Sequence, residues 1–314
     1  MYHPYFRGKQ YELITIRDLA PLLKAAGFCP IIEPVKETLS GLEKTLNAIV
    51  AVNGRAIVIV NPHHGDLSGA GEPLSELLRE KFLKVPGISA GILLKPNMTP
   101  DDALAYYEAH ANHTPVPIHV GFSDAKSLSE KLGTPTKGQA HIFIERYCGK
   151  LYQKHFKNMR RVLLRDGFQR KKNREYESVE PFSDLHATFV DEGMDGFGDF
   201  LMVGDDYNES GGPAYAIAIH LTFIDPEQDD SMLIYHFKSE RQDTPMDPAG
   251  KFAEALAEMM GVLNAPGSKV LETNAVKEFR MLHEQGHFPG LGYVKKLSMN
   301  HHIETLADYF KVTV

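Results

Sequence analysis

The 314-residue sequence predicts an α/β fold: a TIM-barrel-like (β/α) barrel with irregular C-terminal strands and a helical C-terminal extension. Short apolar stretches that end in a polar or charged residue recur along its first half, and helical periodicity follows most of them. The later apolar stretches lack helices between them, and the C-terminal part again shows helical spacing. The six early stretches are FCPIIEP, AIVIVNP, AGILLKP, PVPIHVGF, AHIFIER and RRVLLRD.

The first half alternates predicted helices with predicted buried strands. Strands of a parallel barrel are covered on both faces, so they read as continuous apolar runs rather than alternating ones. After a lead-in over residues 1–10, helices are expected at residues 11–26, 39–50, 74–82, 101–110 and 123–133. The strands between and after them are expected at residues 28–33, 56–60, 91–94, 116–120, 141–144 and 161–164.

The pattern changes after the charged run at residues 169–180. Apolar stretches then predict strands at residues 186–190, 200–203, 215–223 and 232–237. Either two of these strands complete the barrel while two form a side hairpin, or they make a separate antiparallel layer. Helices are expected at residues 249–263, 273–285 and 300–310. We therefore expect a barrel domain over residues 1–264 and a helical extension over residues 265–314 that packs on the barrel.

Composition and charge exclude several classes of protein. The net charge is −7, which argues against broad nucleic-acid binding. The two cysteines, Cys29 and Cys148, lie beside apolar strands, as expected in a reducing compartment. The opening residues do not read as a signal peptide, and no stretch reaches the about 18 apolar residues of a membrane helix. We therefore expect a soluble, cytoplasmic protein.

Polar side chains at the ends of the predicted strands indicate a site at the barrel mouth, where this architecture keeps its chemistry. Groups of mixed sign suit general acid–base work or anion binding. The candidate catalytic residues are Glu33, Lys95, His119 and Glu145. The candidate binding residues for a small anionic ligand, with a nucleotide as one option, are Arg7, Lys9, Asn61, His63 and Arg165. The alternative is that several of these residues form ion pairs that close the barrel rim.

An acidic, glycine-rich segment at residues 191–213 is a second candidate site. Carboxylates on a flexible backbone bind divalent metals through oxygen, and glycines let the main chain approach a phosphate. A divalent metal is therefore the cofactor that this segment suggests. Asp199 and Asp206 flank the predicted strand FLMVG and are candidate ligand-binding residues. The alternative is a solvated acidic loop with tight turns.

Two histidines lie inside the late apolar strands. His220 and His236 face one another if these strands pair, and we include both among the candidate ligand-binding residues. The alternative is that each is a hydrogen-bonded core or cross-strand residue.

The pentad HEQGH at residues 283–287 matches the zinc-binding motif H-E-x-x-H. In that motif two histidines at i and i+4 share a helical face and bind zinc, while the glutamate activates water. The residues concerned are His283, Glu284 and His287. The predicted helix is short and runs into Phe288-Pro289-Gly290, and a barrel is not the architecture of that enzyme class. The sequence therefore favours no metal site here, and the alternative is the end of a surface helix.

Three blocks carry a resemblance: MYHPYFRGKQYE with PIIEPVK, the stretch from GFGDF to GGPAYAIAIH, and GLGYVKKLSMNHHIE. Together they resemble an uncharacterised bacterial family labelled by a myxobacterial "sce" locus tag, over essentially the whole chain. The N-terminal half is also similar, more weakly, to the beta-protein family of the gop–beta–cll phage-exclusion cassette. The resemblance implies a barrel-like, cytoplasmic protein with a role in phage defence. Neither family has established catalytic residues, so none is carried over.

Three functions follow as hypotheses. The first is a barrel enzyme or sensor of a small anionic ligand that acts in phage defence. The second is a non-catalytic subunit for an effector protein encoded nearby, with the charged run at residues 169–180 as its docking segment. The third is a zinc-dependent hydrolase that uses the pentad.

Overall fold

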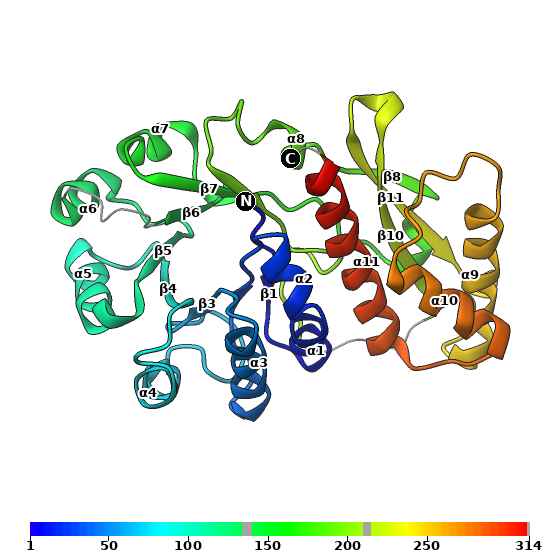
Figure 1. Cartoon of the computed structure of the whole chain (residues 1–314), viewed down its shortest axis with the longest axis horizontal. Coiled ribbons are helices and arrows are strands. Elements are labelled where there is room, and N and C mark those ends of the chain that lie inside the picture. Colours follow the sequence, from blue (N-terminus) through cyan, green and yellow to red (C-terminus); the bar gives the residue numbers. More distant parts are fainter. Residues whose placement is uncertain (134–139, 210–214, 313–314) are drawn as a thin grey trace. The chain divides into compact units, whose positions relative to one another are not determined.

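The computed structural model describes residues 1–133, 140–209 and 215–312. The chain forms two compact units. The barrel unit comprises Met1–Asp166 and Thr188–Phe200, and the C-terminal unit comprises Gly167–Ala187 and Leu201–Val314. Most helices and strands of the two units are labelled in Figure 1.

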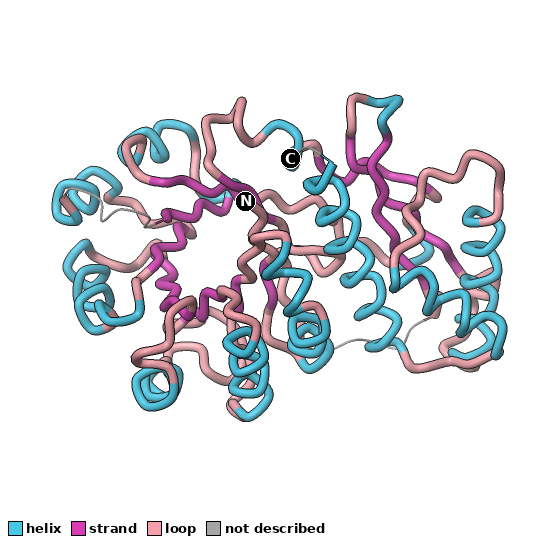
Figure 2. Tube along the Cα trace, in the orientation of Figure 1, coloured by secondary structure: helices cyan, strands magenta, loops and turns pink. Residues whose placement is uncertain are grey.

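The barrel unit is built on one eight-stranded sheet in which every pair of neighbours is parallel. The strands form a ring with helices outside it (Figure 2). A bridge between Tyr2, just before the first strand, and Phe197 in the last strand nearly closes the sheet into a barrel, so the predicted fold class is confirmed. In spatial order the strands are β1 (Tyr5–Phe6), β2 (Ile31–Ile32), β3 (Ala56–Ile59), β4 (Ile88–Leu94), β5 (Val116–His119), β6 (Ala140–Ile144), β7 (Arg160–Leu164) and β9 (Gly196–Gly198).

The last barrel strand, β9, depends on its two glycines. A Cβ atom at Gly198 would lie 2.2 Å from the carbonyl oxygen of His3, and one at Gly196 would lie 2.6 Å from that of Met1. Residues without a side chain therefore let the first and last strands approach closely enough to bond. The N–H of His3 donates to the carbonyl of Phe197 at 2.8 Å across this junction.

Six of the eight barrel strands lie where the sequence predicts them, and the other two lie elsewhere. β1 falls in the expected lead-in, and β9 falls in the glycine-rich segment. Strands expected at residues 186–190 and 200–203 are absent from those described positions, which form helix α8 (Leu185–Thr188) and a turn. These two predictions were wrong because short apolar runs do not distinguish strands from helical turns.

Helices cover the outside of the barrel and follow most of the strands. Helix α5 is fixed at its start by a capping box, in which the Thr99 hydroxyl accepts from the N–H of Asp102 and the Asp102 carboxylate accepts from the N–H of Thr99. The helices are α1 (Gln10–Asp18), α2 (Ala20–Ala25), α3 (Ser40–Ala51), α4 (Glu72–Lys81), α5 (Pro100–Ala109), α6 (Ala125–Leu132) and α7 (Lys150–Gln153).

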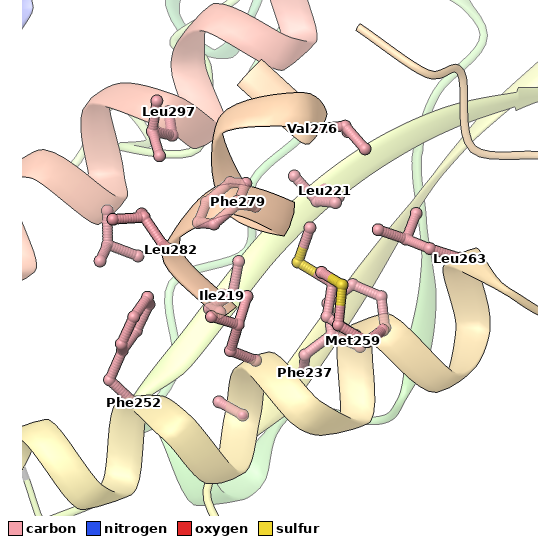
Figure 3. Packing of buried hydrophobic residues seen from close by; sticks show 14 of the residues in the cluster. Ile219, Leu221, Phe237, Phe252, Met259, Leu263, Val276, Phe279, Leu282 and Leu297 are labelled. Carbon is pink, nitrogen blue, oxygen red and sulfur yellow. The ribbon is translucent and has the colours of Figure 1, made fainter. Parts of the chain in front are cut away.

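The C-terminal unit packs three helices on a three-stranded antiparallel sheet. The sheet order is β10 (Ala218–Asp225), β11 (Ser231–Lys238) and β8 (Val179–Ser183). The helices are α9 (Pro248–Leu263), α10 (Asn274–Gln285) and α11 (Leu291–Val312). Their shared core includes Leu221 and Phe237 from the sheet, Met259 from α9, Phe279 from α10 and Leu297 from α11 (Figure 3).

The domain boundary differs from the expected division at residues 264 and 265. Strands β10 and β11 pair with each other and with β8 rather than with the barrel, and α9 packs on them. The expected extension at residues 265–314 therefore shares a core with α9 and the small sheet. Helix α11 begins at Leu291, so the helix expected to start at residue 300 is longer than predicted. In the part of the chain that the structure describes, none of the helices combines the length and the apolar character of a membrane-spanning segment.

Candidate functional site

Strand periodicity places four polar side chains at the mouth of the barrel. The barrel core contains Tyr5, Ile31, Ile59 and Leu93, each on a different strand. Because side chains alternate along a strand, the residues two positions further on also face inward. They stand at the carboxyl ends of parallel strands, where barrels keep their ligand sites. These residues are Arg7, Glu33, Asn61 and Lys95.

Glu33 is the centre of this group and is completely buried. Its carboxylate accepts hydrogen bonds from the Tyr5 hydroxyl at 2.9 Å, from the Arg7 guanidinium, and from the backbone N–H groups of His63 at 2.8 Å and His64 at 3.2 Å. Burial alone raises the pKa of Glu33, but hydrogen bonding to His64 and the charge of Arg7 outweigh it and hold that pKa well below its usual range. Glu33 is therefore ionised at neutral pH, and its carboxylate anchors its neighbours.

Arg7 is held on both sides. Its guanidinium pairs with Glu33 and lies 4.9 Å from the ring centroid of Tyr5 and 5.7 Å from that of Phe200. Such aromatic faces favour a cation. Nδ1 of His64 lies 3.2 Å from Nη1 of Arg7 and 3.2 Å from Oε1 of Glu33, so the histidine ring joins the ion pair.

Lys95 and His63 form the more exposed layer of the mouth. The Lys95 ammonium donates a hydrogen bond to the carbonyl of Pro62 at 3.1 Å. Partial burial lowers the pKa of Lys95, and the charge of Glu33 opposes that effect. The pKa of His63 is lowered by partial burial and then by the nearby charges of His64 and Lys95. We call Arg7, Glu33, His63, His64 and Lys95 the mouth cluster.

Asn61 serves the sheet rather than a ligand. Its Nδ2 donates to the carbonyl of Leu93 at 2.9 Å, and its Oδ1 accepts from the N–H of Leu93 at 2.8 Å. The side chain thus continues the ladder between β3 and β4. Lys9 immediately precedes helix α1, and its carbonyl accepts from the N–H of Leu13 at 2.9 Å.

Glu145 and Arg165 pair with each other. The Arg165 guanidinium donates through Nε to Oε2 at 2.7 Å and through Nη2 to Oε1 at 2.8 Å, and Nη2 also lies 3.2 Å from Oε1 of Glu192. This bidentate geometry fits the alternative in which ion pairs close the rim.

His119 lies on the opposite face of its strand from the core residue Ile118. Its Nδ1 is 2.6 Å from the Tyr152 hydroxyl, and its Nε2 is 3.0 Å from Nδ1 of His141. Burial lowers the pKa of His119 well below its ordinary value and that of His141 to about 4. The structure therefore places His119 in a buried, neutral histidine–tyrosine chain and not in the mouth cluster.

The acidic segment is divided between the two units. Asp199 lies in the barrel unit and accepts from the Tyr2 hydroxyl at 2.7 Å, whereas Asp206 lies in the C-terminal unit, where its carbonyl accepts from Arg170. Residues 210–213 of this segment lie outside the described residues. Within the described ranges, no group of three or more histidine, cysteine, aspartate or glutamate side chains is placed to hold a metal ion.

His220 and His236 face each other, as the sequence predicts for paired strands. They are direct partners in the register of β10 and β11, and their Nδ1 atoms are 2.7 Å apart. Burial lowers the pKa of both rings, to about 4 for His236, so both are neutral at pH 7 and one Nδ1–H donates to the Nδ1 lone pair of the other ring. The His236 ring stacks on Tyr176 at a centroid distance of 4.2 Å. A ligand-binding role for the pair stays a prediction.

The HEQGH pentad does not form the geometry that its motif requires. Helix α10 ends at Gln285, and Gly286 adopts a left-handed conformation with φ of 60°. His283 therefore lies in the last helical turn while His287 lies beyond it, so the two rings do not share a helical face. Both side chains, and that of Glu284, are exposed.

Sequence reasoning missed two members of the site. His64 follows His63 directly and completes the mouth cluster, and Tyr5 in β1 stands two positions before Arg7, which directly follows that strand. Counting in steps of two from Arg7 would have found Tyr5. No protein-family model and no curated protein matches this chain. The site is therefore interpreted from its own geometry.

Proposed function

We propose that the mouth of the barrel unit binds a small anionic ligand, of a phosphate-bearing class that includes nucleotides, as an enzyme or a sensor. The observation that carries the proposal is the mouth cluster. Within the mouth cluster, Arg7 and Lys95 place two cations against one carboxylate, that of Glu33, and His63 and His64 add two ring nitrogens each. The local balance of charge therefore favours an anion.

Lys95 and His63 are the residues that we expect to touch the ligand. Arg7 and Glu33 neutralise one another, so they position the mouth rather than supply its charge. Lys95 is partly buried, and its ammonium donates to the neutral Pro62 carbonyl. A partly desolvated ammonium bonded to a carbonyl gains when an anion replaces its lost hydration, because charge-assisted hydrogen bonds are the stronger kind.

The test is isothermal titration of the full chain with inorganic phosphate and with adenine and guanine nucleotides. Lys95→Met is expected to weaken binding at least about tenfold, the effect of losing one hydrogen bond to a charged group. The matched control is Lys126→Met, which removes an exposed lysine on α6. No binding of any anion, or equal affinities in Lys95→Met and the control, would overturn the proposal.

We further propose that this binding serves phage defence in the cytoplasm, for which the resemblance of the three sequence blocks is the support. The assay is the plaquing efficiency of phages on cells that carry the gene with its neighbours. Loss of protection in Lys95→Met is expected. Full protection in that variant, with a neighbouring gene product that co-purifies with the chain, would instead favour the non-catalytic subunit.

A further inference from the structure

A groove between helices α4 and α5 lies on the outside of the barrel unit and shares no residue with the mouth cluster. The two helices neighbour each other outside the ring of strands (Figure 1). The groove has a cavity volume of about 360 Å³ and is lined by polar and apolar side chains together. Its polar lining includes Ser75 and Arg79 from α4 and His110 at the end of α5.

Ser75 and His110 form a hydrogen-bonded pair in this groove. The Ser75 Oγ lies 2.9 Å from Nε2 of His110, and Nδ1 of His110 lies 2.8 Å from the carbonyl oxygen of Tyr106. A carbonyl only accepts hydrogen bonds, so in the neutral ring Nδ1 carries the proton and Nε2 is left with a lone pair. The Ser75 hydroxyl therefore donates to His110 at 2.9 Å, which is shorter than its 3.4 Å distance to the other acceptor within reach, the Gly71 carbonyl. This is the polarity of a serine nucleophile with its general base.

The base is held in place while the nucleophile faces the groove. His110 is only 5% exposed, and hydrogen bonds at both ring nitrogens fix its orientation. Ser75 is partly exposed and lines the cavity. The Tyr106 carbonyl has the place that a carboxylate takes in a catalytic triad, so it orients the ring without adding a full negative charge.

The remaining lining suits an acyl group. Arg79 stands four residues after Ser75 on the same face of α4, and its Nη1 lies 3.8 Å from Oε1 of Glu72, which also lines the groove. Its other guanidinium donors can stabilise negative charge that develops on a carbonyl oxygen. The side chains of Leu83, Ala105 and Ala109 give the groove an apolar part, and its volume of about 360 Å³, near the lower end for ligand pockets, suits a short acyl chain.

We infer that the α4–α5 groove is a hydrolytic site for small carboxylic esters, with Ser75 as nucleophile and His110 as general base. The Ser75 oxygen bonds to the ester carbonyl carbon as its proton passes to Nε2 of His110. The bond from that carbon to the alcohol oxygen then breaks, and the alcohol leaves with the proton from His110. Water, activated by the same nitrogen, cleaves the acyl-serine, releases the carboxylic acid and restores the hydroxyl.

The experiment treats the full chain with a fluorophosphonate probe, which loses fluoride and phosphonylates an activated serine oxygen. Intact mass and peptide mapping should find one added group, on Ser75. Ser75→Ala should abolish the addition, and His110→Gln should slow it at least about a hundredfold, the lower end of what a general base contributes. The matched control is Ser129→Ala, since the Ser129 hydroxyl donates to the backbone carbonyl of Lys126 instead of a histidine.

A second measurement separates a catalytic pair from a structural one. Hydrolysis of p-nitrophenyl acetate should fall with the same variants. No labelling of folded wild type, labelling at another residue, or labelling that is equal in Ser75→Ala would overturn the inference.

Discussion

Replacing Glu33 with alanine is expected to destabilise the barrel unit strongly, because the change leaves a buried cation without its counter-charge. Glu33 is fully buried and Arg7 is 4% exposed. The carboxylate also accepts hydrogen bonds from Tyr5 and from two backbone N–H groups. Removing one member of a buried ion pair costs about 3–5 kcal/mol. This is a large share of the roughly 5–15 kcal/mol that keeps a domain folded.

The assay is urea unfolding followed by far-UV circular dichroism, since the chain has no tryptophan for fluorescence. Hydrogen exchange of backbone amides assigns the loss to the barrel unit rather than to the C-terminal unit. The matched control is the double variant Arg7→Met with Glu33→Leu, which removes both charges and should recover part of the loss. A Glu33→Ala protein within about 1 kcal/mol of wild type would refute the reasoning.

The same carboxylate gives the prediction a pH dependence. Because the pKa of Glu33 is held below its usual range, its contribution is complete above the unfolded-state pKa of about 4.3. That contribution is lost as the pH falls towards the lower pKa of the folded chain. The stability difference between wild type and Glu33→Gln should therefore shrink below about pH 4.

Two further predictions concern protonation at one buried position, His141, and an added side chain at another, Gly198. Burial lowers the pKa of His141 from 6.5 to about 4. Between these two pH values the unfolded chain binds a proton at His141 and the folded chain does not. The free energy of unfolding should therefore fall by about 3 kcal/mol as the pH drops from 6.5 to 4. A pH series of urea unfolding on wild type and His141→Phe checks this, and parallel curves would contradict it. Gly198→Ala directs a Cβ atom to 2.2 Å from the His3 carbonyl oxygen and should cost about 1–3 kcal/mol in thermal unfolding. Gly149→Ala meets no atom within 4 Å and is the control, so equal melting temperatures would count against the close-approach argument.

Most of the barrel could be predicted from the sequence because six of its strands are apolar runs with polar ends. The sequences of the remaining two strands, β1 and β9, have little of the apolar character that predicts a strand. β1 has two residues within an aromatic and basic segment, and β9 reads Gly-Phe-Gly, in which the glycines have low strand propensity. Their placement depends on the close approach of distant backbone segments, which local propensity does not record.

The candidate site was harder to predict because a strand covered on both faces does not show which face is inward. Glu33 and Lys95 fall on the inward face, whereas His119 is one residue past the core residue Ile118 and points the other way. All three residues stand at strand ends, so that position does not show which side chains face the inside of the barrel. A neighbouring residue known to lie in the core, such as Ile118, is needed to assign the face. The end of the helix in the pentad could have been predicted, because glycine often follows the last residue of a helix. Gly286 takes that position and lies between the two histidines of the pentad.

The order of the barrel strands along the chain limits how the barrel can be made on its own. β7 ends at Leu164, yet its neighbour β9 begins only at Gly196, after the residues 167–187 that belong to the other unit. A protein cut at residue 166 would lack β9 and expose two unpaired edges, on β1 and β7, which are templates for aggregation. During synthesis on the ribosome, the ring likewise stays open until the chain has passed Gly198. A soluble barrel fragment should therefore extend to Phe200 and retain the inserted segment or a short loop in its place.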